Sequence, residues 1–101
     1  MRIDLVNGTD VWIISKNGLE YLFAVIYNIE RQQPELNYFN PRTELEGGST
    51  FRVTHYNIFL LIEQGLDMLA DLEDEEIEDQ GCLKDYERAV FDEAMRILGW
   101  A

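Results

Sequence analysis

The sequence predicts an α+β fold in which a small antiparallel sheet, made of an N-terminal hairpin and one further short strand, is packed by two or three helices. Two observations lead to this fold class. Turn dipeptides separate short β-branched runs in the first twenty residues, whereas apolar residues recur every three or four positions in two later segments. A chain of 101 residues can bury one core, so we expect a single acidic globular domain over residues 1–101. An all-helical bundle with a short hairpin is the fallback.

The N-terminal residues predict the hairpin. Ile3 and Leu5 alternate with polar neighbours, and residues 11–14 form a β-branched and aromatic run that is typical of a buried strand. Asn7 and Gly8 lie between the two strands. This dipeptide favours a two-residue turn because both residues readily adopt a positive φ.

Residues 19–33 are compatible with two structures. Asn17 can cap a helix in which apolar residues recur at three- and four-residue spacing, and Pro34 would end that helix. Alternatively, Asn17 and Gly18 form a second hairpin turn, which sends residues 19–27 back as a long strand. We favour the helix, because its apolar spacing continues through the segment.

Residues 34–49 are predicted to be the least ordered part of the chain, because they hold both prolines and a Gly-Gly-Ser turn. Tyr38 and Phe39 lie in this loop. Aromatic side chains are enriched at the centres of protein interfaces, so this pair is our candidate for an exposed anchor that contacts a partner. The alternation in residues 50–54 predicts the short strand that completes the sheet, after which Thr54 can cap a helix.

The helix over residues 56–72 is the clearest prediction. Its apolar face is formed by residues at helical spacing: Ile58, Leu61, Ile62, Leu69 and Leu72, with Phe59 and Leu66 widening it. Gly65 lies on the same face, although a glycine inside a helix costs about 0.8–1 kcal/mol relative to alanine. We therefore expect the backbone of another helix, from this chain or from a second copy, to approach Gly65 closely.

A second helix is predicted over residues 83–98, ending at Gly99. Its apolar stripe consists of Leu83, Tyr86, Val90, Ala94 and Ile97, with Phe91 and Leu98 beside it. The solvent side holds two pairs with ion-pair spacing: Asp85 with Arg88, and Asp92 with Arg96. Trp100 either packs against the end of this helix or faces a partner, and we favour packing.

Acidic residues dominate the charge: 20 Asp and Glu stand against 8 Lys and Arg, for a net charge of −12. Such a charge repels nucleic acid and anionic membranes, so neither is expected as a direct ligand. The densest segment, which we call the acidic run, covers residues 71–79 and has seven carboxylates: Asp71, Glu73, Asp74, Glu75, Glu76, Glu78 and Asp79. Like charges this close repel each other, so the run serves solubility alone, reflects adaptation to high salt, or is a docking surface for a basic partner.

The sequence holds no catalytic, metal or cofactor motif. Cys82 is the single cysteine, which excludes an internal disulfide, and no apolar leader follows Met1, so we expect a cytoplasmic protein. His55 is the single histidine, and together with Cys82 it offers two of the four ligands that a structural zinc needs. A calcium loop starting at Asp71 would place Glu76 where glycine is required. We therefore predict no enzyme, no metal and no cofactor.

These observations favour a binding protein. The leading prediction is a non-enzymatic, acidic protein-binding inhibitor that presents carboxylates where a partner protein expects phosphates, and so occupies the partner's basic, nucleic-acid-binding surface. Phage anti-defence proteins and bacterial nuclease immunity proteins or antitoxins are the settings for such a nucleic-acid mimic. The binding residues would be the acidic run together with Tyr38 and Phe39. The alternative is a structural or adaptor module, homodimeric through the Gly65 face, in which the acidic run only keeps the protein soluble.

Overall fold

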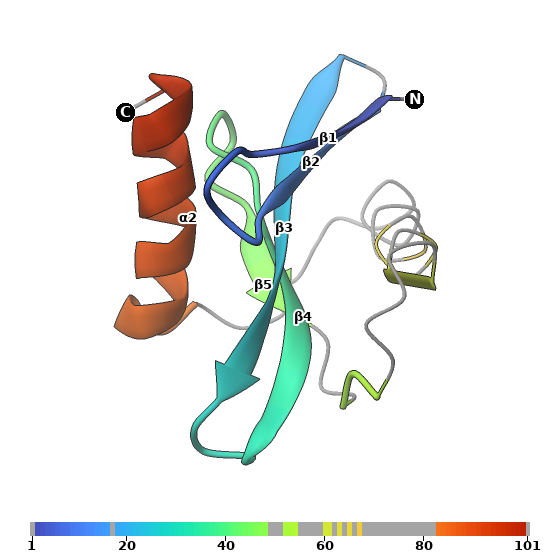
Figure 1. Cartoon of the computed structure of the whole chain (residues 1–101), viewed down its shortest axis with the longest axis vertical. Coiled ribbons are helices and arrows are strands. Elements are labelled where there is room, and N and C mark those ends of the chain that lie inside the picture. The colour runs from blue at the N-terminus through green and yellow to red at the C-terminus, as the bar shows by residue number, and fades with distance from the viewer. Residues whose placement is uncertain are drawn as a thin grey trace.

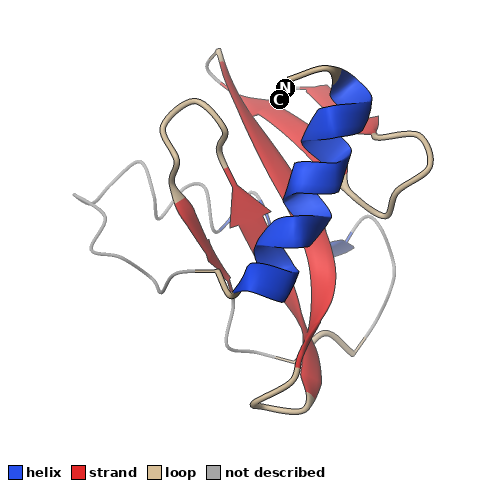
Figure 2. Ribbon diagram, turned by 90° about the vertical axis from the view of Figure 1, so that its left-hand side faces the viewer, coloured by secondary structure: helices blue, strands red, loops and turns tan. Residues whose placement is uncertain are grey.

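The computed structural model of the chain describes residues 2–16, 18–48, 52–54, 60, 61, 63, 65, 67 and 83–100. Five antiparallel strands form one sheet in the order of the sequence: β1 (Arg2–Leu5), β2 (Trp12–Lys16), β3 (Leu19–Asn28), β4 (Gln33–Phe39) and β5 (Glu46–Gly48). The helix α2 (Asp85–Leu98) lies across one face of the sheet (Figures 1 and 2). The prediction of a small sheet packed by two or three helices is therefore wrong: over the described residues the sheet has five strands, and α2 is the one helix described along its whole length.

The N-terminal hairpin is present, but its loop is longer than the predicted two-residue turn. Leu5 pairs with Trp12, which leaves six residues between the strands. The Val6 N–H donates to the Val11 carbonyl at 2.9 Å. Inside the loop, the Thr9 hydroxyl donates to the Val6 carbonyl at 3.0 Å and accepts from the Val11 N–H at 3.2 Å. The threonine side chain thus supplies hydrogen bonds that a two-residue turn would not need.

The helix favoured over residues 19–33 is wrong, and the strand interpretation is correct. Lys16 pairs with Leu19 across a two-residue connection, and Gly18 has a φ of +77°. β3 is then covered on both faces, so that consecutive side chains from Tyr21 to Ala24 are all buried. A strand buried on both sides loses the alternation of apolar and polar residues, and its apolar positions can match a helical spacing by coincidence.

The segment predicted to be least ordered instead forms β4, β5 and the loop between them. Asn40, which is fully buried, organises this loop. Its backbone N–H donates to the Leu45 carbonyl, and its carbonyl accepts from the Glu44 N–H, both at 2.8 Å. Its side-chain oxygen accepts from the backbone N–H of Arg42 at 2.9 Å and of Thr43 at 3.3 Å. An asparagine at the end of a strand commonly nucleates a turn in this way.

The strand predicted over residues 50–54 is wrong for the part that is described, because Arg52, Val53 and Thr54 belong to no strand. Val53 is nevertheless buried, and its backbone N–H donates to the carbonyl of Pro34 at 2.8 Å. The chain therefore crosses beside the start of β4 without joining the sheet. The predicted cap at Thr54 would act on residues 55–57, which lie outside the described residues.

The sheet separates two layers of core. The layer under α2 contains Val6, Val11, Ile13, Leu22, Ala24, Ile26, Phe39, Phe91, Ala94 and Met95. The layer on the other face contains Trp12, Ile14, Tyr21, Phe23, Leu36, Tyr38, Val53 and Leu61. Figure 1 shows α2 on one side of the sheet and the described residues between 60 and 67 on the other. Those five residues, Leu60, Leu61, Glu63, Gly65 and Asp67, have helical backbone.

The helix predicted at the C-terminus is present, but its buried side differs from the predicted apolar stripe. Phe91, Ala94 and Met95 are buried, whereas Ile97 is 46% exposed. Glu87 is also buried because its carboxylate accepts from the Lys84 backbone N–H at 3.0 Å and so caps the first turn. The predicted end at Gly99 is confirmed.

The two ion pairs predicted on α2 are replaced by others. Arg88 contacts Asp92 at 3.2 Å and Glu46 of β5 at 3.4 Å, and its guanidinium lies 4.0 Å from the centre of the Phe39 ring. Arg96 pairs with Glu93 instead of Asp92. In its observed position Arg88 reaches a carboxylate and an aromatic ring of the sheet, which favours this arrangement over a pair with Asp85.

Gly65 provides the first test of the packing. A Cβ at this position would lie 3.2 Å from Ile14 Cδ1 and 3.3 Å from Phe23 Cε1, so the close neighbour is the sheet of the same chain and not another helix. Gly65→Leu should therefore lower stability, because overpacking costs about 1–3 kcal/mol against about 1 kcal/mol gained in helix propensity. The measurement is the melting temperature at several protein concentrations, with the exposed Glu63→Leu as the matched control.

A fall in the Gly65→Leu melting temperature that does not vary with concentration would agree with an internal contact. A melting temperature that rises, or a parent protein that dissociates on dilution while the variant does not, would contradict it.

Candidate partner-binding surface

The acidic run, which is the main predicted binding element, lies outside the described residues, as do His55 and Cys82. The prediction for the run therefore stays a prediction. The part of the chain that the structure describes contains the other 13 acidic residues and the backbone of all 8 basic residues.

The prediction that Tyr38 and Phe39 are exposed is wrong, because both are buried on opposite faces of β4. Tyr38 is the register partner of Phe23, with ring centres 6.0 Å apart, and Phe23 in turn pairs with Trp12 at 6.4 Å. Gly47 on β5 allows this packing, since a Cβ there would lie 2.8 Å from the Tyr38 hydroxyl.

Phe39 holds α2 onto the sheet. Its ring lies 6.2 Å from that of Phe91, and the guanidinium of Arg88 covers it. Both members of the predicted anchor therefore serve the two core layers, where aromatic side chains bury the most surface.

Exposed apolar side chains are found instead at the end of the β3–β4 hairpin. Tyr27 is 55% exposed and Ile29 is 62% exposed. Figure 1 shows that this hairpin extends beyond the other described elements. Residues 27–32 form what we call the hairpin tip. Sequence reasoning missed the tip because the helix favoured over residues 19–33 would have placed both side chains near a buried stripe.

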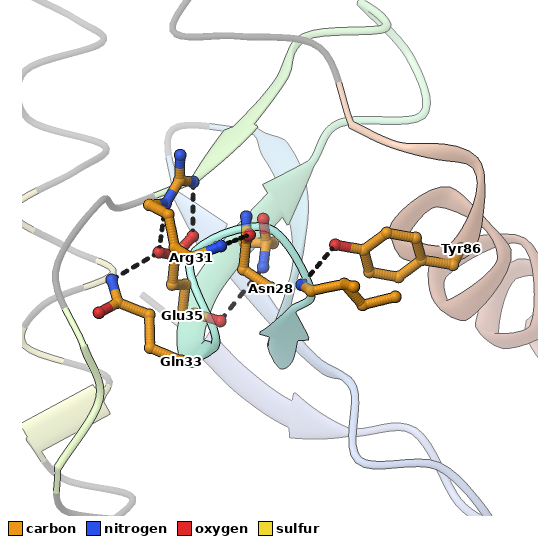
Figure 3. Close-up of polar contacts among 7 residues, drawn as sticks. Asn28, Arg31, Gln33, Glu35 and Tyr86 are labelled. Carbon is orange, nitrogen blue, oxygen red and sulfur yellow. Dashed lines mark hydrogen bonds and ion pairs between the residues drawn. The ribbon is translucent and has the colours of Figure 1, made fainter.

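The hairpin tip is held by hydrogen bonds from two sides (Figure 3). The side-chain oxygen of Asn28 accepts from the Arg31 backbone N–H at 2.8 Å and closes the turn. The Ile29 backbone N–H donates to the Tyr86 hydroxyl at 3.1 Å, which ties the turn to α2. An ion pair between Lys84 and Glu30, at 3.4 Å, joins the same two elements. The tip is thus preorganised by contacts to its own strands and to α2.

Glu35 is the most deeply buried ionisable side chain beside the tip. Arg31 donates to it from Nε at 2.6 Å and from Nη2 at 2.7 Å, and Gln33 donates from Nε2 at 2.7 Å. The hydrogen bonds from Arg31 lower the pKa of Glu35; burial acts in the opposite direction, and the bond from Gln33 adds to the lowering. A bidentate guanidinium is the geometry that best offsets the cost of burying a carboxylate.

Four of the basic side chains are engaged in ion pairs within the fold: Arg31, Lys84, Arg88 and Arg96. Arg42 and Arg52 form no ion pair among the described residues. Four of the eight basic side chains are therefore paired within the fold, and the sequence has more carboxylates than basic side chains to pair with them.

The described residues show no group of three or more histidine, cysteine or acidic side chains that could hold a metal ion. In the same residues, no helix has the length and apolar character needed to span a membrane. Comparison with protein-family models, with curated protein sequences and with solved structures finds no match to the chain.

Glu35→Gln tests the ion pair at the hairpin tip. Because the folded pKa of Glu35 is lowered, its contribution to stability is present above the unfolded pKa, about 4.3, and is lost as the pH falls through the folded value. We expect Glu35→Gln to lower the free energy of unfolding by about 1–2 kcal/mol at pH 7, since the hydrogen bonds from Arg31 lose their charged acceptor. The variant should lose less stability than the parent between pH 5 and pH 2.5.

The measurement is urea unfolding at pH 7, pH 5 and pH 2.5. Glu63→Gln is the control, because Glu63 is exposed and its substitution removes one carboxylate elsewhere in the chain. Equal losses of stability on acidification in the parent and in Glu35→Gln would contradict the assignment.

Proposed function

We propose that the chain is a non-enzymatic, acidic protein-binding inhibitor that occupies a basic, nucleic-acid-binding surface of a partner protein. The observation that carries this proposal is the charge: a net of −12 on 101 residues, with seven carboxylates in nine consecutive residues. Closely spaced carboxylates can stand in for the phosphates of a nucleic acid, and they speed the encounter with a positive surface.

The internal use of positive charge supports the proposal. Arg31 and Arg88 are committed to carboxylates and, in the case of Arg88, to an aromatic ring. A partner that approaches the chain therefore meets an excess of carboxylates, together with Arg42 and Arg52, which form no ion pair among the described residues. Long-range attraction of this kind depends on the excess charge and is screened at high salt.

The hairpin tip supplies what charge alone cannot, which is an apolar anchor. Electrostatic attraction raises association rates, whereas tight complexes also need a few well-placed side chains that become buried on binding. Tyr27 and Ile29 are exposed and are presented on a turn that hydrogen bonds hold in place. We propose them as the anchor in the role first predicted for Tyr38 and Phe39.

The experiment that tests the function is capture followed by competition. The tagged chain would be incubated with lysate of its native host at 50 and 500 mM salt, conditions chosen to separate screened from unscreened binding. The proposal requires a basic protein that binds mainly at low salt and whose binding to labelled DNA or RNA is abolished by the chain. A stable homo-oligomer with no such partner would favour the adaptor alternative.

Neutralising the acidic run tests its part in binding. Replacing Asp74, Glu75, Glu76 and Glu78 with their amides should slow association with the captured partner by about tenfold or more at low salt, and much less at high salt. The measurement is surface plasmon resonance at two salt concentrations. Unchanged association rates would leave the run with a role in solubility alone.

Truncating the tip tests the anchor. Tyr27→Ser with Ile29→Ser should speed dissociation of the complex by about tenfold or more, since loss of an interface anchor costs at least about 1.4 kcal/mol. Ile97→Ser is the matched control, because Ile97 is a comparably exposed aliphatic residue on the outer side of α2. Equal effects of the tip double variant and of Ile97→Ser, or no effect of the tip variant, would remove the tip from the interface.

A further inference from the structure

The loop between β1 and β2 presents an asparagine–glycine pair at the surface. Asn7 and Gly8 are both exposed. They occupy the two central positions of a β-turn, which the Thr9 backbone N–H closes by donating to the Val6 carbonyl at 3.1 Å. Gly8 has a φ of +83°, and Asn7 does not share this positive value. The turn therefore fits type II, and not the type I′ turn that the same pair favours in a two-residue hairpin.

The ends of this turn are fixed, whereas its central groups have no partners. Val6 is buried in the layer under α2, and the Thr9 hydroxyl donates to its carbonyl at 3.0 Å. Within the described part of the chain, the Gly8 backbone N–H and the Asn7 side chain form no hydrogen bond. The Gly8 nitrogen and the Asn7 side-chain amide are therefore adjacent, exposed and not engaged elsewhere in the described structure.

The three other asparagines that the structure describes differ from Asn7. Asn28, Asn37 and Asn40 are at most 5% exposed. The backbone N–H that follows Asn28 donates to the Tyr86 hydroxyl, and the residue after Asn40 is a proline, which has no N–H. Among the described asparagines, Asn7 therefore combines an exposed side chain with a following N–H that is neither bonded nor crowded.

We propose that Asn7 is a site of spontaneous deamidation, with Gly8 supplying the nucleophile. The Gly8 backbone nitrogen attacks the side-chain carbonyl carbon of Asn7 and closes a five-membered succinimide ring. The bond from that carbon to the side-chain nitrogen breaks, and the nitrogen leaves as ammonia with the proton that Gly8 gives up. Water then opens the ring at either carbonyl, which leaves aspartate or isoaspartate at position 7. Water is the one co-reactant, and no atom changes its oxidation state.

Glycine is the residue that hinders this attack least. It has no Cβ to crowd the nitrogen as the nitrogen approaches the Asn7 carbonyl carbon, and its backbone rotates at little steric cost. Apart from its chain neighbours, no atom lies within 4 Å of the place where a Cβ on Gly8 would stand. The two reacting groups also belong to adjacent residues, so the step needs no encounter between separate molecules.

Each product changes the turn in a defined way. Both add one carboxylate, which makes the chain more negative than its present −12. Isoaspartate also passes the backbone through the side chain, which lengthens it by one carbon between Val6 and Gly8. The hydrogen bonds from Thr9 to the Val6 carbonyl span this segment, so we expect isoaspartate to weaken them and aspartate to leave them in place. The reaction needs no partner and is independent of the proposed function.

Peptide mapping of the full chain tests the site. The folded protein would be incubated at neutral pH and cleaved with trypsin, and a zero-time sample corrects for modification during digestion. The tryptic peptide 3–16 contains Asn7 as its single asparagine, and the peptide 32–42 contains the buried Asn37 and Asn40 as an internal control. We expect peptide 3–16 to convert with time to its aspartate and isoaspartate forms, detected by mass spectrometry and by isoaspartyl methylation, while Asn37 and Asn40 stay unmodified.

The same incubation in guanidinium chloride measures how far the fold protects Asn7. The folded chain should react less than about tenfold more slowly than the unfolded chain, which corresponds to a barrier raised by less than about 1.4 kcal/mol. This comparison separates the contribution of the turn from the reactivity of the sequence alone.

Two glycine variants form a matched pair. Gly8→Ala and Gly18→Ala each place a Cβ in open space at a positive φ, +83° and +77°, so their backbone strain is alike. Gly8→Ala should slow deamidation in peptide 3–16 by about tenfold or more, whereas Gly18→Ala should leave its rate unchanged. Asn7→Ser should remove the modified forms of this peptide.

The proposal is overturned if peptide 3–16 stays unmodified in the folded chain, or if folding slows its reaction by more than the stated factor. It is also overturned if the buried asparagines react as fast as Asn7, or if Gly8→Ala and Gly18→Ala slow the reaction equally. None of these results bears on the inhibitor proposal, which the capture and competition experiment decides.

Discussion

Burial of the central strand β3 on both of its faces is the constraint on which the rest of this structure depends. One face of β3 needs α2, and the other needs the layer that contains Leu61 and Val53. The aromatic row Trp12, Phe23 and Tyr38 runs across three strands on the second face. Each ring is placed by the register of its neighbours, so the five-stranded order and the aromatic packing stabilise each other.

Covering both faces leaves several polar groups inside the protein, and some of those with a described partner shape a turn or a helix end. Asn28 closes the hairpin tip, Asn40 organises the β4–β5 loop, and Glu87 caps α2. Glu35 is held by Arg31 beside the same tip. A buried polar group without partners is costly, and these contacts offset that cost at the loops.

The ion pairs within the fold also affect how charge is distributed in the molecule. Arginine and lysine side chains are drawn into contacts that tie the tip, β5 and α2 together, whereas the excess of carboxylates has no internal counterpart. The proposed inhibitor uses that excess for encounter and the hairpin tip for anchoring.

The sequence by itself determined the features that depend on local chemistry. The net charge, the single cysteine, the hairpin near the N-terminus and the helix that ends at Gly99 all follow from composition, turn residues or a one-sided apolar stripe. A local pattern is enough to predict α2 because this helix buries one side only, so its period of 3.6 residues remains visible in the sequence.

Only the tertiary structure decided that residues 19–28 form a strand, that Tyr38 and Phe39 are buried, and that Gly65 meets the sheet. Two apolar faces remove the alternation that identifies a strand, so the local pattern fits a helix equally well. The exposed tip belongs to the same group, because it is formed by the pairing of β3 with β4 and by contacts to Tyr86 and Lys84 at the start of α2. Such contacts join residues far apart in the chain, and no local period records them.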